Sequence, residues 1–175
     1  MICIVDKNGK VVNIINADEL STPDRREYYP WLSIGEAWCS TMPLDYAKKV
    51  KHAEAGLAFA RQRDKVRYIA LNGQSYGFDC APVDITNFMA NMKRAELLGT
   101  SEHKVFHEGA KRVVEFSYLN FKTVLLSVSE DQLKWYDWYK KKVAEIEGCQ
   151  TVEEVQNVSL NCIESDPNKD QNTCS

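Results

Sequence analysis

Short apolar runs separated by polar turns open the chain. Two of them, Ile2–Val5 and Val11–Ile15, flank a polar segment that contains Asn8-Gly9. Asn-Gly favours a tight turn because both residues adopt positive φ readily. The pattern therefore predicts an N-terminal β-hairpin.

The residues after this hairpin are first charged and then apolar again. Residues 18–27 are polar and predict a loop, whereas residues 28–32 and 34–38 are short apolar pieces punctuated by Pro30 and Gly35. Because a two-stranded hairpin is barely stable alone, we expect these pieces to add one or two strands. Residues 1–42 are thus predicted to form a small β-rich module.

Between residues 43 and 67 the composition changes to Ala, Lys, Arg and Glu, which predicts a linking helix. At about 100° per residue, apolar side chains fall on two sides of this helix. One side carries Ala47, Val50, Ala53 and Leu57, and the other carries Ala55, Ala58 and Phe59. Such a helix either lies between two layers of its own protein or packs against another chain.

The next segment repeats the hairpin pattern and then becomes helical. Apolar residues around Asn72-Gly73 predict a second β-hairpin. Asp84 is a suitable N-cap for a helix with one apolar face, and Gly99 is a suitable end. Residues 113–116 and 121–126 are rich in β-branched and aromatic side chains and predict a pair of strands.

Two tetrads fit the capping box, in which a hydroxyl and a Glu or Gln three residues later satisfy each other's backbone N–H groups. They are Ser129-Glu130-Asp131-Gln132 and Thr151-Val152-Glu153-Glu154. We therefore expect helices to begin at Ser129 and Thr151. Residues 164–173 contain no apolar side chain, and residues 161–175 are predicted to be a flexible polar tail.

Together these elements predict an α+β protein. Its parts are, in chain order, the N-terminal β module (1–42), the linking helix (43–67), a C-terminal domain (68–160) and the polar tail (161–175). The C-terminal domain is expected to contain a β-hairpin, a helix, a strand pair and terminal helices.

Two aromatic rings do not fit the predicted buried stripes. On the helix expected from Ser129, a core stripe is formed by Trp135, Tyr136, Tyr139, Val143 and Ile146. Trp138 projects toward the charged side of that helix, and Phe59 lies off the first apolar side of the linking helix. Tryptophan and tyrosine are enriched among interface hot spots. The two aromatic rings off the stripes, Phe59 and Trp138, are therefore the candidate partner-binding residues. The alternative is that each ring packs one module against another.

Charge and cysteine usage narrow the class of protein. The net charge of −3 and the pI near 5.7 argue against nucleic-acid binding. No stretch approaches the roughly 20 apolar residues of a membrane span, so we expect no membrane partner and synthesis in the cytoplasm. The six cysteines are dispersed without a Cys-x-x-Cys pair, which predicts reduced thiols and no zinc site.

The sequence contains no recognisable catalytic or cofactor-binding motif. His103 and His107 have the spacing of two metal ligands on a helix, but no third ligand is indicated, so we expect neither a metal nor a cofactor. Cys3 and Cys80 lie in or beside apolar strand candidates, where a buried inert thiol is the expected state. We therefore predict that the protein is not an enzyme.

The order of these elements resembles an uncharacterised domain found at the C-terminal end of many small tailed-phage proteins, often encoded beside tail-fibre genes. The similarity covers about half of the chain and rests on the Asn72-Gly73 hairpin, the Asp84 helix, the strand pair, the Ser129 start and the Thr151 box. The N-terminal part is similar to the openings of such proteins through Ile34-Gly35-Glu36-Ala37-Trp38. Those openings often continue with Asp-Gly, where this chain has Cys39-Ser40.

The resemblance implies a phage tail-associated structural protein, located in the virion near the tail fibre or baseplate, whose partners are other phage tail proteins. Self-association into a homo-oligomer is a further expectation. Two alternatives remain open: a tail-fibre assembly chaperone, and a small phage protein that inhibits a host factor.

Overall fold

The computed structural model describes residues 1–15, 25–37 and 39–161. Within them the chain is α+β, which confirms the predicted fold class, and it contains two antiparallel sheets. It divides into two compact units, Met1–His52 with Ile146–Val158, and Ala53–Glu145 with the residues from Ser159 onward. Helices α1 (Leu44–Arg63) and α3 (Tyr118–Gly148) each contribute to both units. The predicted tail lies outside the described residues, apart from Asn161.

The first unit contains a three-stranded sheet in the order β2-β1-β3. Strands β1 (Ile2–Val5) and β2 (Val11–Ile15) form the predicted hairpin, and Gly9 supplies the positive φ of its turn. The Asp6 carboxylate accepts hydrogen bonds from the backbone N–H groups of Asn8 and Lys10. The sheet has a small core of its own, made by Cys3, Val5, Val11 and Leu32.

The third strand of this sheet comes from a segment that the sequence predicted to be a loop. It is β3 (Arg25–Glu27), which pairs with β1. The predicted strand at residues 28–32 is wrong: Trp31 and Leu32 pack on the small core from an irregular segment. Of the piece at residues 34–38, Ala37 makes an isolated bridge to Lys10, and Trp38 is outside the described residues.

The second unit is built on a four-stranded antiparallel sheet in the order β4-β5-β6-β7. Strands β4 (Arg67–Leu71) and β5 (Gln74–Phe78) form the predicted second hairpin. Asn72 and Gly73 have φ values of 52° and 80°, as a type I′ turn requires. Strands β6 (Thr100–His107) and β7 (Ala110–Ser117) pair along their whole length.

Helix α2 (Pro82–Leu98) has Ala81 at its N-cap and so begins three residues earlier than predicted. Pro82 occupies the first turn, where its missing N–H leaves no bond unmade, and Asp84 lies in that turn without capping it. Gly99 ends the helix as predicted, with a φ of 88° and its N–H donating to the Ala95 carbonyl.

The predicted strand at residues 121–126 is also wrong, because these residues belong to α3. β7 pairs instead with β6, where the sequence predicts no strand. Phe121, Val124 and Val128 are buried at helical spacing, and this apolar face carries the helix through Ser129 without interruption. Ser129 therefore lies inside α3 and starts no helix. The Thr151 capping box is confirmed at the start of α4 (Val152–Asn157).

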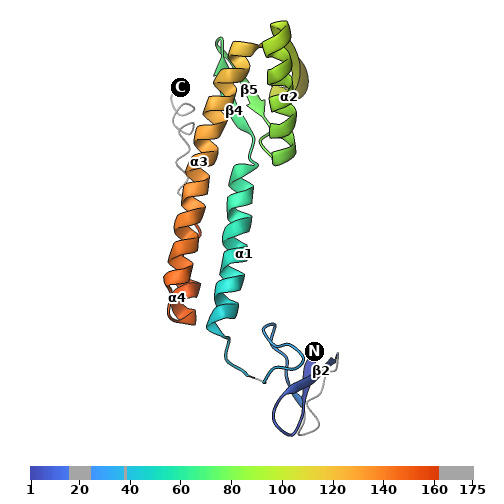
Figure 1. Ribbon diagram of the computed structural model, residues 1–175, viewed down its shortest axis with the longest axis vertical. Coiled ribbons are helices and arrows are strands. Elements are labelled where there is room, and N and C mark those ends of the chain that lie inside the picture. The colour runs from blue at the N-terminus through green and yellow to red at the C-terminus, as the bar shows by residue number, and fades with distance from the viewer. Residues whose placement is uncertain (16–24, 38, 162–175) are drawn as a thin grey trace. The chain divides into compact units, whose positions relative to one another are not determined.

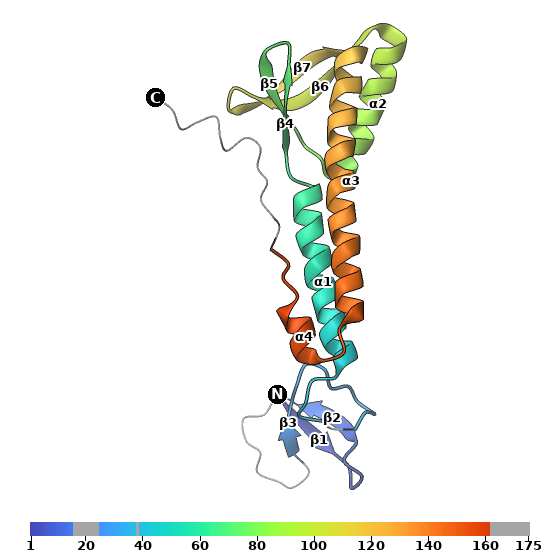
Figure 2. The same ribbon diagram turned by 90° about the vertical axis from the view of Figure 1, so that its left-hand side faces the viewer.

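Helices α2 and α3 lie side by side against one face of the four-stranded sheet (Figures 1 and 2). Aromatic rings fill the space between these layers: Phe88 contacts Phe78 and Phe121, and Phe116 contacts both Phe78 and Phe121. This shared core fixes which side of each helix is buried. The opposite sides of α2 and α3 consequently face away from the sheet.

Candidate functional site

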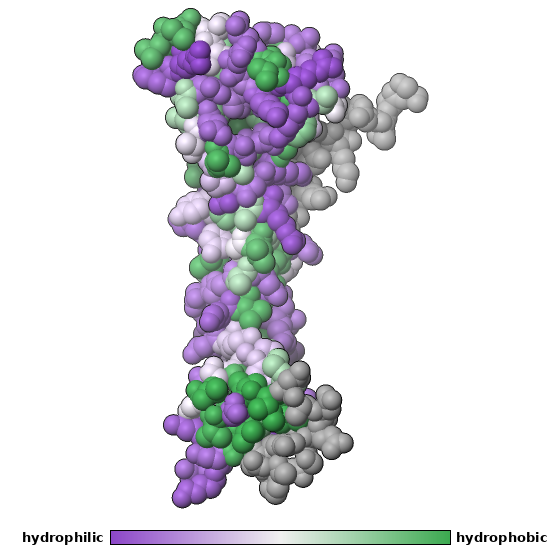
Figure 3. Space-filling model, turned by 90° about the vertical axis from the view of Figure 1, so that its right-hand side faces the viewer, coloured by the Kyte–Doolittle hydropathy of each residue, from purple (hydrophilic) through white to green (hydrophobic). Residues whose placement is uncertain are grey.

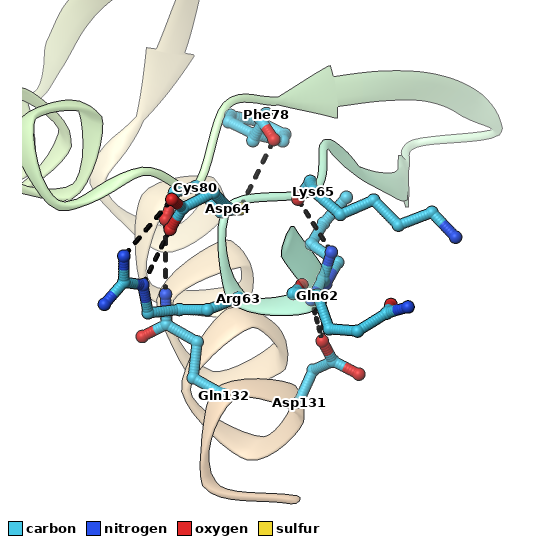
Figure 4. Close-up of polar contacts among 9 residues, drawn as sticks. Gln62, Arg63, Asp64, Lys65, Phe78, Cys80, Asp131 and Gln132 are labelled. Atoms are coloured by element: carbon cyan, nitrogen blue, oxygen red, sulfur yellow. Dashed lines mark hydrogen bonds and ion pairs between the residues drawn. The ribbon is translucent and has the colours of Figure 1, made fainter. Parts of the chain in front are cut away.

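A polar cluster joins the end of α1 to β4 and α3 (Figure 4). The guanidinium of Arg67 donates through Nε to Asp131 Oδ2 at 2.5 Å, and its other nitrogens donate to the Gln62 and Lys65 carbonyls. Arginine suits this position because its planar group donates in several directions at once. The cluster satisfies carbonyls that the end of α1 leaves without helical partners. Each of the three guanidinium nitrogens of Arg67 thereby has a partner within the fold.

Cys80 lies beside this cluster and is almost fully buried. Its thiol donates to the Phe78 carbonyl, while its own carbonyl accepts from Gln132 Nε2 (Figure 4). Burial raises the pKa of the Cys80 thiol by more than the charge and hydrogen bond of Arg67 lower it, and the charges of Asp131 and Asp79 add smaller increases. A nucleophilic cysteine needs a lowered pKa and exposure. This geometry is that of an inert structural thiol.

A shallow, open depression in the first unit is lined by Asp45, Lys48, Lys49, His52 and Glu147. Lys48 Nζ donates to the Glu147 backbone carbonyl at 2.7 Å, and His52 Nε2 lies 2.6 Å from Glu147 Oε1. A cation beside the last carbonyls of α3 is favoured by the helix dipole. These contacts join the start of α1 to the end of α3, and the lining residues include no Ser, Thr or Cys side chain that the His–Glu pair could activate.

His103 lies in a box of aromatic rings on β6. The rings of Phe78, Phe88 and Phe121 surround its imidazole, and the Asn91 amide nitrogen lies 2.9 Å from His103 Nδ1. Burial lowers the pKa of His103, against the opposing charges of Asp84 and Asp79. His107, at the end of the same strand, stacks on Tyr76. In the described ranges, no group of three or more His, Cys, Asp or Glu side chains is arranged to hold a metal ion.

The structure places the two predicted partner-binding rings in different surroundings. Phe59 is half-buried, stacks on Tyr139 with ring centres 5.2 Å apart, and carries the Arg63 guanidinium over its face. Trp138 is also half-buried and meets Trp135 edge to face. No ring contact joins Phe59 to Trp138 in the part of the chain that is described. Each ring keeps part of its surface open to solvent.

The predicted core stripe of α3 and the two predicted apolar sides of α1 are only partly buried. On α3, Ile146 is fully buried, whereas Tyr136 is half exposed. On α1, Ala47 and Ala55 are buried, whereas Val50 and Leu57 remain exposed. Apolar surface is thus left in contact with solvent on both helices.

Among the described residues, the most regular exposed apolar surface lies on α3. This surface is not among those that the sequence predicts. Leu119, Leu126 and Leu133 recur every seven residues on the side of α3 opposite the buried Phe121, Val124 and Val128, and they are 56–70% exposed. We call these three residues the leucine stripe. A seven-residue repeat keeps side chains on nearly one face of a helix. The repeat itself is visible in the sequence, but it becomes a surface only if residues 118–133 are one helix.

A second gathering of apolar side chains lies on the first unit, where Met1, Val12 and Ile34 are exposed and Figure 3 shows hydrophobic surface over the N-terminal sheet. Residues 16–24, which adjoin this sheet in the chain, are outside the described ranges. Over the second unit, Figure 3 shows hydrophobic patches separated by hydrophilic surface.

Comparisons with known proteins identify no relative. No family model, no curated protein and no solved structure matches the chain. A separate search of the described helices finds none with the length and apolar character needed to cross a membrane. The residues themselves therefore carry the functional argument.

Proposed function

We propose that this protein is a structural component of a bacteriophage tail, in the region of the tail fibre or baseplate, and that it works by binding other proteins. The observation that carries the binding role is the leucine stripe of α3. The phage setting comes from the resemblance of residues 68–158 to the C-terminal domain of small tail-associated proteins. Tail proteins, further copies of this chain among them, are accordingly the proposed partners, and the virion is the proposed location.

The leucine stripe supports binding because regular apolar surface is costly to leave in water. Full burial of a leucine side chain contributes about 1.5–3 kcal/mol, and apolar side chains that recur along one helix face are the anchors of helix-mediated recognition. Single exposed apolar residues are common and need no explanation, so the support for binding comes from the repetition of leucine along one helix face.

The chemistry of the remaining clusters supports the same proposal. Arg67 and Asp131 are engaged with each other and with the end of α1, and Cys80 is a buried thiol of raised pKa. The His52–Glu147 pair joins two helices. These side chains have structural partners, so the proposal assigns the work of the molecule to its surface.

Quantitative mass spectrometry of purified virions tests the proposal. A structural component is expected at a fixed stoichiometry to the tail-fibre and baseplate proteins, through gradient purification and salt washing. A tail-fibre chaperone would be present in infected cells and substoichiometric in virions, and an inhibitor of a host factor would be absent from virions. Either of these results would refute the structural role.

A further inference from the structure

The leucine stripe has a counterpart on the neighbouring helix. On α2, Val83, Ala90 and Leu97 also recur every seven residues, opposite the buried Phe88 and Ala95. Val83 and Leu97 are 66% and 72% exposed. Helices α2 and α3 form one layer against the sheet (Figures 1 and 2). Because both helices bury their other sides in the same core, the two stripes lie on the side of that layer that faces away from the sheet.

The two stripes share one centre. The Tyr118 N–H donates to the Gly99 carbonyl, so the end of α2 and the start of α3 are at the same level. At 1.5 Å per residue, Ala90 lies roughly 13 Å before that point and Leu126 roughly 12 Å after it, along two helices that run antiparallel. Val83 and Leu97 are seven residues to either side of Ala90, and Leu119 and Leu133 are seven to either side of Leu126.

We infer that this face binds a second copy of the chain, with a two-fold axis passing near Ala90 and Leu126 at right angles to the helices. Under that axis Leu126 meets Leu126 of the other copy, Leu119 meets Leu133, and Val83 meets Leu97. The same patch then serves both subunits, as a two-fold interface requires. The inference rests on the proposed function only in taking the leucine stripe to be a protein-binding surface.

Charge beside the stripe selects this direction of the two-fold axis. Lys122 lies four residues before Leu126 and Glu130 four residues after it; both are exposed, and neither forms an ion pair within residues 39–161. The proposed axis brings Lys122 to the level of Glu130 of the other copy, twice. An axis parallel to the helices would bring Lys122 to the level of Lys122 and Glu130 to that of Glu130. Like charges at one level disfavour that second arrangement.

Sedimentation equilibrium of the full chain over micromolar to millimolar concentrations tests the inference. We expect a concentration-dependent species of twice the 20.0 kDa chain mass. Leu126→Glu places two carboxylates at the centre of the interface and should weaken dimerisation at least about tenfold, as burial of unpaired charge requires. Leu57→Glu is the matched control: Leu57 is an exposed leucine on α1, and its replacement should leave the dissociation constant unchanged.

A charge exchange tests the direction of the axis. Lys122→Glu and Glu130→Lys should each weaken the dimer by several-fold, and the double variant should restore it, because the exchange recreates both pairs. Lys104→Glu, an exposed residue on β6, controls for net charge alone. Circular dichroism of each variant verifies the fold.

Each outcome decides the inference. A wild-type chain that stays monomeric, or a dimer that Leu126→Glu leaves intact, overturns it, and a double variant that fails to recover overturns the direction of the axis. The result is independent of the virion measurement. A monomer found at fixed stoichiometry in virions would refute only the dimer, and a dimer absent from virions would refute only the tail role.

Discussion

Val124 and Leu126 distinguish the observed helix from the strand that the sequence predicts at residues 121–126. In a strand, residues two apart lie on the same face, so truncating either side chain should cost about the same. In α3 they lie about 200° apart. Val124 is 2% exposed in the main core, and Leu126 is 56% exposed.

The expected costs follow from this difference in burial. Val124→Ala removes two methyl groups at about 0.8 kcal/mol each, and the cavity adds about 1 kcal/mol. The higher helix propensity of Ala returns a few tenths of a kcal/mol. We therefore expect Val124→Ala to lower the free energy of unfolding by about 2 kcal/mol, and Leu126→Ala by less than about 0.5 kcal/mol.

Urea denaturation followed by circular dichroism measures both values. The protein should be dilute, so that self-association through Leu126 does not contribute to stability. The slope of the unfolding free energy with urea should stay constant between variants, since a changed slope signals a different unfolded state. Equal losses for Val124→Ala and Leu126→Ala would refute the helical assignment, and with it the leucine stripe.

Three further predictions concern the polar and thiol groups. Arg67→Met should lower the free energy of unfolding by about 2 kcal/mol in the same assay, because Asp131 and two carbonyls lose a charged donor. A loss below about 0.5 kcal/mol, the range of ordinary surface substitutions, would mean that water replaces the guanidinium as their donor. The folded-state pKa of His103 is lowered, so the unfolded chain binds a proton first as pH falls below about 6.5. The contribution of His103 to the free energy of unfolding should therefore be constant above that pH, and should fall below it until the folded state is protonated too. Denaturation of His103→Gln at pH 7.5 and 5.5 should show that this loss of stability has disappeared. A loss that persists unchanged in the variant would assign it to other groups. Alkylation of the native protein, followed by site-resolved mass spectrometry, should modify the exposed Cys39. The buried Cys3 and Cys80, whose pKa values are raised, should react only after unfolding. Fast labelling of Cys80 would contradict its assignment as an inert structural thiol.

The elements that the sequence predicts correctly have a local cause. The Asn72-Gly73 turn depends on two residues that accept positive φ, and both adopt it. The Thr151 capping box closes within four residues, and both of its hydrogen bonds form. Such features need no knowledge of the rest of the chain, which explains why both hairpins and the last helix are predicted.

The elements that the sequence predicts wrongly depend on distant partners. Residues 121–126 form a short apolar run that suits a buried strand or a buried helix, and only the packing of Phe121 against Phe88 and Phe116 decides between them. The Ser129 tetrad has the residue types of a helix start, but the buried face on both sides of it holds the chain helical. β6 is missed because its core-facing residues include Ser101 and His103, which are polar and yet buried or half-buried.

The wrong prediction of a strand at residues 121–126 also explains why the sequence does not reveal the leucine stripe. With a predicted strand at residues 121–126 and a predicted helix from Ser129, the three leucines of the stripe do not belong to one element. In one continuous helix, Phe121, Val124 and Val128 supply the buried face. Leu119, Leu126 and Leu133 are then left exposed on the opposite face. Phe59 and Trp138 were selected for lying off their helical stripes, yet both make ring contacts on their own unit. The surplus apolar surface is therefore a property of the helix register, and a substitution that shifts that register should alter folding and binding together.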